Sequence, residues 1–279
     1  MPTYDPTFAL GDFTVRRLGY GAMRITGDGV WGPPKDKRSA IRVLQRAVEL
    51  GVNFIDTADS YGPFVSEELI AEALHPYHDG LLIATKAGLM RDGPNKWRPN
   101  ARPEHLEERC KSSLQRLKLE RIDLFQLHRF DDKVPADEYL GKLAELQQQG
   151  YVRHLGLSEV TIAQIEQAQQ HFEVVSVQNK YNLGERQWED ELDWCAERGI
   201  GFIPWYPLSA GSFEHEGLQR VAQRHAASPY QIALAWLLHH KPNLLPIPGT
   251  SSVAHLEENL AAANIELSDE DLQELSTTD

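Results

Sequence analysis

Four residues with complementary acid–base chemistry stand at or just after strand-like apolar runs in separate parts of the chain. Asp56 and Tyr61 belong to the segment IDTADSYG, Lys86 ends LLIATK, and His128 ends LFQLH. A phenol has an ordinary pKa of ~10. An ammonium ~4 Å away, at an effective dielectric near 20, favours the phenolate by ~4 kcal/mol, or roughly three pK units. We therefore expect Lys86 to lower the pKa of Tyr61, with Asp56 keeping Lys86 charged.

This set of side chains is suited to moving a proton to or from a carbonyl or alcohol oxygen. Tyr61 would donate the proton, and His128 would orient the oxygen by a hydrogen bond. The set has no nucleophile with an adjacent base and no cluster of metal ligands, so no metal is expected. Since no side chain can supply a hydride, reduction of a carbonyl requires a cofactor.

The elements that must position these residues alternate strictly along the chain. A hairpin is predicted first, from Phe8–Leu10 and Phe13–Val15. The predicted strands are Leu18–Ala22, Val52–Ile55, Gly80–Thr85, Ile122–Leu127, Val152–Leu157, Val174–Gln178, Gly201–Trp205 and Leu244–Ile247. The predicted helices are Asp36–Leu50, Ser66–Leu74, Pro103–Leu117, Ala136–Gln149, Thr161–His171, Trp188–Arg198, Pro229–His240 and Val253–Ala263.

Eight strand–helix units in one chain of 279 residues predict an α/β fold, a (β/α)8 TIM barrel with a short N-terminal β-hairpin. We expect one domain over residues 1–279. The alternative, an open doubly wound sheet, normally has a Gly-x-Gly-x-x-Gly turn after its first strand. Gly19 and Gly21 begin such a pattern, but Arg24 takes the third position. Taken singly, each polar strand end has a simpler structural explanation. A barrel, however, brings all of them to one mouth.

Three long loops after predicted strands carry aromatic residues that could face a ligand. They are read as unstructured insertions at Met23–Pro34, Gly88–Arg102 and Tyr206–Glu216. Loops at the carboxyl ends of barrel strands surround the active site. The expected substrate-contacting residues are Trp31, Trp97 and Phe130, with Trp205 as a further wall. These rings favour a flat or aromatic aldehyde.

Composition excludes several classes of function. The formal net charge of −13 disfavours nucleic acid and anionic membranes as partners. Cys110 and Cys195 lack metal-ligand or redox spacing and are expected to be reduced thiols. No segment has the pattern of a signal peptide, and no apolar run approaches the ~20 residues that span a bilayer. We expect a soluble, cytoplasmic protein.

From about Leu18 to Asn264 the sequence resembles the aldo-keto reductase superfamily. Six widely spaced motifs carry the resemblance in order: IDTADSYG, ATK, LFQLH, LGLSE, VQNKYN and IPGTSSVAHLEENL. The segments RLGYGAM, VWGPPKD and PGTSSVAHL are most similar to bacterial members related to pyridoxal reductase.

The resemblance implies an NAD(P)H-dependent reductase that converts an aldehyde or ketone to the alcohol. In it Tyr61 would be the general acid, Lys86 its pKa modulator, Asp56 the partner of Lys86, and His128 the orienting group. The resemblance also implies a cofactor site. Its expected residues are Gly21, Ala22, Met23, Asp56, Ser158, Gln178, Trp205, Tyr206, Pro207, Leu208, Gly211, Gly249, Thr250, Ser251, His255, Glu258 and Asn259.

Two departures from the family pattern affect the cofactor. Glu159 stands where an Asn is common, and a carboxylate cannot donate to a carboxamide oxygen as an amide can. Gly249 and His255 replace basic residues that often surround a 2′-phosphate. The hydroxyls of residues 250–252 just before a helix N-terminus still form an anion site. We therefore expect NADPH rather than NADH.

Two other functions are compatible with a barrel of this kind. A non-catalytic, nucleotide-binding regulatory subunit would not need the intact set of Asp56, Tyr61, Lys86 and His128. A metal-dependent hydrolase or isomerase would need paired histidines on an early strand, where the sequence has LGYGAM. We expect a monomer acting on a small carbonyl substrate, with pyridoxal, another aromatic aldehyde and small aldehydes as candidates.

Overall fold

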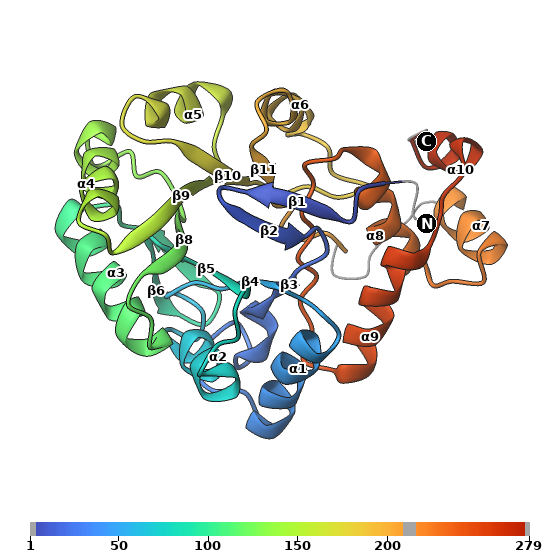
Figure 1. Cartoon of the computed structure of the whole chain (residues 1–279), viewed down its shortest axis with the longest axis horizontal. Helices are drawn as coiled ribbons and strands as arrows, with labels where there is room; N and C mark the ends of the chain where they lie inside the picture. Colours follow the sequence, from blue (N-terminus) through green and yellow to red (C-terminus); the bar gives the residue numbers. More distant parts are fainter. Residues whose placement is uncertain (1–3, 209–215, 277–279) are drawn as a thin grey trace.

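The computed structural model describes residues 4–208 and 216–276, in which a curled parallel sheet is surrounded by helices (Figure 1). Seven strands form the sheet in the order β11-β10-β9-β8-β5-β4-β3. Their bounds are β3 Tyr20–Gly21, β4 Phe54–Asp56, β5 Leu82–Ala87, β8 Ile122–Leu127, β9 Val152–Ser158, β10 Val174–Gln178 and β11 Gly201–Phe202. All neighbouring strands are parallel, so their carboxyl ends meet at one mouth.

Residues 244–246 close the gap between β11 and β3. Leu245 N donates to Phe202 O at 2.8 Å, and Gly19 N donates to Pro246 O at 3.0 Å. The predicted strand Leu244–Ile247 is not a regular strand, because Pro246 has no N–H to donate to a neighbouring chain. The predicted (β/α)8 barrel is confirmed, with its eighth strand reduced to a bridge.

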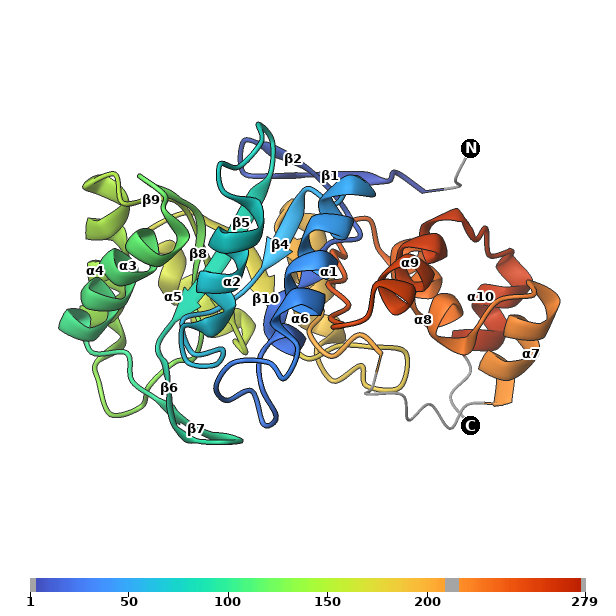
Figure 2. The same cartoon turned by 90° about the horizontal axis from the view of Figure 1, so that it is seen from below.

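The predicted N-terminal hairpin is also confirmed, as β1 (Thr7–Leu10) paired with β2 (Phe13–Arg16). Leu10 and Val15 from this hairpin share one buried cluster with Phe54, Leu82 and Leu124 of the barrel strands. Figure 2 shows β1 and β2 at the end of the molecule opposite to β6 and β7. The hairpin therefore plugs the amino end of the barrel and leaves the carboxyl end for a site.

All eight predicted helices are present. They are α1 Lys37–Glu49, α2 Val65–Leu74, α3 Pro103–Leu117, α4 Ala136–Gln148, α5 Ile162–Gln169, α6 Glu189–Glu197, α8 Pro229–His240 and α9 Val253–Ala261. Thr161 and Ser228 begin α5 and α8 with reciprocal capping boxes. Gly51, Gly150 and Gly199 follow α1, α4 and α6 with φ of 90°, 83° and 67°, as expected of left-handed C-caps.

Several elements were missing from the sequence prediction. They are α7 Glu216–Arg224, α10 Asp269–Ser276, the short 3₁₀ helices η1 Ala22–Ile25 and η3 Ala262–Asn264, and the hairpin β6 Leu89–Gly93 with β7 Lys96–Pro99. The segment Gly88–Arg102 is therefore not an unstructured insertion. Its DGPN turn, with Asn95 at φ 54°, lets the chain reverse and form an antiparallel ladder.

Candidate active site

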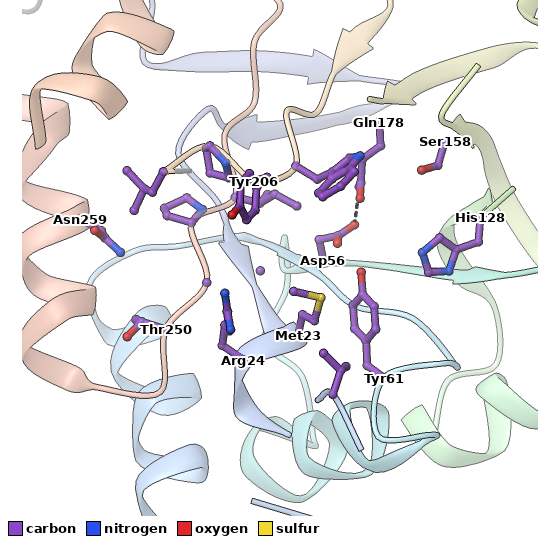
Figure 3. A pocket seen from close by; sticks show the side chains of 18 of the residues that line it. Met23, Arg24, Asp56, Tyr61, His128, Ser158, Gln178, Tyr206, Thr250 and Asn259 are labelled. Carbon is purple, nitrogen blue, oxygen red and sulfur yellow. Dashed lines mark hydrogen bonds between the residues drawn. The ribbon is translucent and has the colours of Figure 1, made fainter. Parts of the chain in front are cut away.

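Three strand ends and one loop bring the four predicted catalytic residues together. Asp56 is the last residue of β4, Lys86 lies in β5, His128 follows β8, and Tyr61 lies in the loop between β4 and α2. Lys86 Nζ donates to Asp56 Oδ1 at 2.6 Å and is 3.5 Å from Tyr61 Oη. Figure 3 shows Asp56, Tyr61 and His128 turned toward one another at the pocket.

The loop that carries Tyr61 is fixed by backbone hydrogen bonds to the neighbouring strand. Thr57 N donates to Ala84 O at 2.8 Å, and Asp59 N donates to Lys86 O at 3.1 Å. Gly62 then turns the chain into α2 with φ 104°, and a Cβ there would lie 2.4 Å from Val65 Cβ. Only glycine fits this turn without strain, so the position of Tyr61 follows from the local sequence.

The Lys86–Asp56 pair is buried and fully hydrogen-bonded. The side chains are 0% and 2% exposed, and Lys86 Nζ also donates to Thr57 O at 2.7 Å. Gln126 and Gln178 both donate to Asp56 Oδ2, at 3.2 and 2.9 Å. Burial, the largest single effect, would lower the pKa of Lys86, but the charges and hydrogen bonds of Asp56 and Tyr61 together outweigh it, and the pKa is raised. Lys86 is therefore charged.

Burial raises the pKa of Tyr61, although the charge of Lys86 lowers it. Lys86 acts in the direction that we expected from the sequence, but the expected net lowering of the Tyr61 pKa is wrong. The simple two-charge argument omitted the loss of water around the phenol and the opposing charge of Asp56. The consequence is a phenol that keeps its proton until a reaction develops negative charge beside it.

His128 is buried at the same mouth, and its ring centroid lies 6.0 Å from that of Tyr61. Burial, followed by the charges of Lys86, Arg129 and Arg91, lowers the pKa of His128 well below its ordinary value. The imidazole is therefore neutral at pH 7. Ser60 Oγ and His128 Nδ1 form a hydrogen bond at 3.4 Å, which engages Nδ1 within the protein.

A cavity of about 820 Å³ opens beside these residues. Tyr61, Asp56 and His128 line it, whereas Lys86 lies behind Tyr61 and Asp56 with no exposed surface. The expected cofactor residues that line the cavity are Gly21, Met23, Asp56, Ser158, Gln178, Trp205, Tyr206, Pro207, Leu208, Gly249, Thr250, His255, Glu258 and Asn259. The cavity thus extends from the reacting groups to the N-terminal end of α9.

Two other expected cofactor residues, Ala22 and Ser251, are not among the described residues that line the cavity. Ala22 is fully buried in a cluster behind it, and Ser251 is exposed. Gly211 lies outside the described residues. The side chain of Ala22 lies in the core at η1, which is compatible with the expectation that Ala22 approaches the cofactor through its backbone.

Of the three expected substrate residues, one lines the cavity and two do not. Trp97 on β7 lines the cavity, but Trp31 and Phe130 do not. Phe130 packs on Tyr139 of α4 with ring centroids 5.5 Å apart. The guanidinium carbon of Arg91 is 3.6 Å from the Trp97 ring centroid and 5.7 Å from that of Trp31. The sequence could not show which of two rings beside the same arginine faces the pocket.

Two arginines at the cavity were missed by the sequence analysis. Arg24 directly follows Met23, and Arg129 directly follows His128. The available signal was adjacency to a predicted site residue, but the direction in which a loop side chain points is not readable from sequence. Arg24 is exposed and makes no ion pair with any residue in the described ranges.

Ser158 and Gln178 keep hydrogen-bonding capacity for a ligand. Arg129 Nη1 donates to Ser158 Oγ at 3.0 Å, which leaves the hydroxyl proton of Ser158 free to donate. Gln178 gives its amide N–H to Asp56, as Figure 3 shows, and so presents its carbonyl oxygen as an acceptor. Together the two residues offer one donor and one acceptor, the complement of a primary carboxamide.

Glu159 does not face this donor–acceptor pair. It adopts a φ of 55°, and its Oε1 accepts from Trp205 Nε1 at 2.5 Å and from Lys180 N at 2.7 Å. The side chain therefore holds the indole of Trp205 at the rim of the cavity. The Glu159 carboxylate contacts Trp205 and does not face Ser158 and Gln178, so it does not disturb their donor–acceptor pair.

The far end of the cavity is formed by backbone and by the start of α9. A Cβ at Gly249 would lie 2.7 Å from Gly21 O, and a Cβ at Gly21 would lie 2.6 Å from Ile247 O. Ser252 caps α9 by accepting from His255 N. The free N–H groups and dipole of such a helix start favour an anion.

The described residues contain neither a metal-binding cluster nor a membrane-spanning helix. Residues 4–208 and 216–276 contain no group of three or more His, Cys, Asp or Glu placed to hold a metal ion. In the same ranges no helix is both long and apolar enough to cross a membrane.

Comparison with known proteins identifies the family. Residues 17–279 match the aldo/keto reductase family. The chain belongs to the aldo-keto reductases. This reductase is 53% identical over 266 residues to an uncharacterised oxidoreductase of Schizosaccharomyces pombe, covering 95% of the chain and 87% of the relative. It is 46% identical over 276 residues to pyridoxine 4-dehydrogenase of Escherichia coli, covering 96% of each.

A solved structure supports the same relationship. The aldo/keto reductase of Klebsiella pneumoniae in complex with NADP and acetate superposes with a TM-score of 0.83 at 26% identity, covering 97% of this chain and 94% of that one. The family and these relatives identify an oxidoreductase and support carbonyl reduction as its chemistry.

Proposed function

We propose that this aldo-keto reductase reduces an aldehyde or ketone to the alcohol with NADPH, using Tyr61 as the proton donor. The observation that carries the proposal is the Tyr61 hydroxyl 3.5 Å from the buried Lys86 Nζ, with the His128 ring 6.0 Å from the Tyr61 ring on the same cavity wall. In this arrangement a proton donor, a stabilising cation and an orienting group would surround one position for an oxygen atom.

In the proposed mechanism His128 and Tyr61 bind the carbonyl oxygen. The nicotinamide cofactor, when bound, supplies the hydride. As negative charge develops on the oxygen, Tyr61 transfers its proton, and Lys86 at 3.5 Å stabilises the resulting phenolate. Asp56 keeps Lys86 charged throughout. The raised pKa of Tyr61 ensures that the proton is present when the reaction begins.

The residues around the cavity fit a nicotinamide nucleotide. Ser158 and Gln178 would hold the carboxamide, and the indole of Trp205 would lie against the ring. At Gly21 and Gly249, which both line the cavity, an added Cβ would collide with the neighbouring backbone, so only glycine lets these two segments lie this close together. Arg24 would meet the phosphate groups near the start of α9.

NADPH is proposed over NADH because Arg24 provides a cation at the end of the cavity where the expected basic residues are absent. Glu258 lines the same end and opposes this charge, so the preference is modest. Dissociation constants of both cofactors by fluorescence quenching test it. Arg24→Met should weaken NADPH more than NADH. NADH binding as tight as NADPH in the unaltered protein would contradict the preference.

The proposed substrate class is an aromatic or small aldehyde, with pyridoxal as one candidate. The Trp97 ring at the cavity wall and the 46% identity to pyridoxine 4-dehydrogenase of E. coli support it. An initial-rate screen with NADPH against pyridoxal, benzaldehydes, short aldehydes, methylglyoxal and sugars would identify the class.

Tyr61→Phe tests the mechanism directly. Removing one hydroxyl should lower turnover by roughly 10²- to 10⁴-fold, the usual range for a general acid. Cofactor affinity should change little, because the phenol does not carry the proposed cofactor contacts. Turnover within tenfold of the unaltered enzyme would refute Tyr61 as the acid.

A further inference from the structure

Arg129 has one half of its guanidinium fixed and the other half available. It follows β8 immediately after His128 and lines the cavity. Its Nη1 donates to His128 O at 2.6 Å and to Ser158 Oγ at 3.0 Å, which uses both protons of that nitrogen. Across residues 4–208 and 216–276, Nε and Nη2 have no hydrogen-bond partner. The free Nε–Nη2 edge is the pair of donors that binds a carboxylate bidentately.

Within residues 4–208 and 216–276, no carboxylate lies within salt-bridge distance of Arg129, so its charge has no ion-pair partner there. Glu159 acts on it only at longer range, since its Oε1 is occupied by Trp205 Nε1 and Lys180 N. Burial lowers the pKa of Arg129, which reflects the cost of holding this cation away from water. An unpaired, partly buried guanidinium is an unusual feature unless a ligand completes it.

We propose that Arg129 is a substrate-binding residue that selects carbonyl compounds bearing a carboxylate. The free edge of the guanidinium would pair with the carboxylate while Tyr61 and His128 hold the carbonyl oxygen. This inference rests on the proposed function and adds a substrate class to it. With Trp97 on the cavity wall, aromatic aldehydes with a ring carboxylate suit both features.

The arrangement favours the substrate over the cofactor as the partner of this edge. Arg129 Nη1, and not the free edge, donates to Ser158 on the side of the cavity where the carboxamide is proposed to lie. His128, the immediate neighbour of Arg129, belongs to the side where the carbonyl oxygen is proposed to bind. A planar pair of donors also matches a carboxylate better than a single-point contact would.

The test compares two aldehydes of similar shape that differ in charge. kcat/KM is measured with NADPH for 4-carboxybenzaldehyde and for its neutral counterpart 4-formylbenzamide, and then for the 3-substituted pair. The unaltered enzyme should prefer the acid of at least one pair by roughly 10- to 100-fold, as expected for a buried charge-assisted contact. Arg129→Met should reduce this ratio to about one or below. Arg129→Lys should give an intermediate ratio, because the charge remains without the planar donor pair.

The ratio distinguishes recognition from a structural role. If Arg129 only held Ser158, its loss would slow both aldehydes equally and leave the ratio unchanged. Arg38→Met removes one positive charge from α1, outside the cavity lining, and should retain the preference. If Arg129→Met does not fold, the ratios of the unaltered enzyme and of Arg129→Lys still decide.

Each result has one meaning. Reduction of both aldehydes of each pair at similar kcat/KM by the unaltered enzyme would overturn the inference and leave the proposed function intact. A ratio unchanged in Arg129→Met would do the same. If the enzyme reduces neither aldehyde of either pair and no compound of the wider screen, the proposed function and this inference are overturned together.

Discussion

Removal of Lys86 should destabilise the protein severely because it leaves Asp56 as an unpaired buried charge. The two side chains are 0% and 2% exposed and form a contact of 2.6 Å. Breaking a buried pair by deleting one partner typically costs about 3–5 kcal/mol. Lys86→Met also leaves Thr57 O without its donor at 2.7 Å. We expect Lys86→Met to decrease the free energy of unfolding by about 3–5 kcal/mol, as measured by urea denaturation followed by circular dichroism.

A double-mutant cycle separates the pair from the rest of the site. Asp56→Asn alone leaves a buried ammonium, whereas Lys86→Met combined with Asp56→Asn leaves no charge. The double variant should therefore lose less stability than the sum of the single losses, by about 2 kcal/mol, within the range for contacting residues. Both single variants should also lose most carbonyl reductase activity.

The control is an ion pair of similar length at the surface. Lys35 and Asp28 are 2.7 Å apart and each is 85% exposed. Lys35→Met should leave the stability nearly unchanged, because water already screens this pair. A loss below ~1 kcal/mol for Lys86→Met, or strictly additive losses in the cycle, would refute the argument from burial.

Two further predictions concern carboxyl groups near the site. Glu159→Ala should raise the dissociation constant for NADPH about tenfold in fluorescence titrations, because Trp205 Nε1 loses its acceptor at 2.5 Å, a charge-assisted bond. Glu159→Gln keeps an acceptor oxygen and should restore most of the affinity, and equal affinities in all three proteins would contradict this role. Burial and the nearby charge of Glu67 raise the pKa of Asp59 to about 8, and its Oδ1 has no hydrogen-bond partner in the described residues. The unfolded chain releases this proton near pH ~4, so stability should fall between pH ~4 and 8 by up to ~1.4 kcal/mol per pH unit from this group. Asp59→Asn should remove that slope in urea denaturations at pH 5 and pH 8, and an unchanged slope would show that Asp59 does not cause it.

Much of the site could be predicted from the sequence because a parallel barrel imposes a simple geometry. Every strand presents its carboxyl end at the same mouth, so residues that end strands in sequence become neighbours in space. This geometry alone predicts that the side chains of Asp56, Lys86 and His128 lie close together. Tyr61 followed because the turn that ends at Gly62 is short and its glycine is required.

The sequence predicted the helices and the parallel sheet correctly, but it did not predict the form of the last strand or the hairpin of β6 and β7. Alternating apolar periodicity identified all eight of the predicted helices and the parallel sheet, but Pro246 turned the last strand into a bridge. The hairpin of β6 and β7 was missed because its ladder depends on one tight turn and not on apolar alternation. It places Trp97 at the cavity, and so bears on the choice of substrate.

The sequence by itself determined which residue types reach the mouth of the barrel, because strand ends and tight turns are local features. Only the tertiary structure decided what those residues do to one another. The pKa of Tyr61 depends on its burial and on two opposing charges from different strands. Likewise, Glu159 turns to Trp205 and Arg129 keeps one free edge, since the direction of a side chain is set by partners distant in sequence.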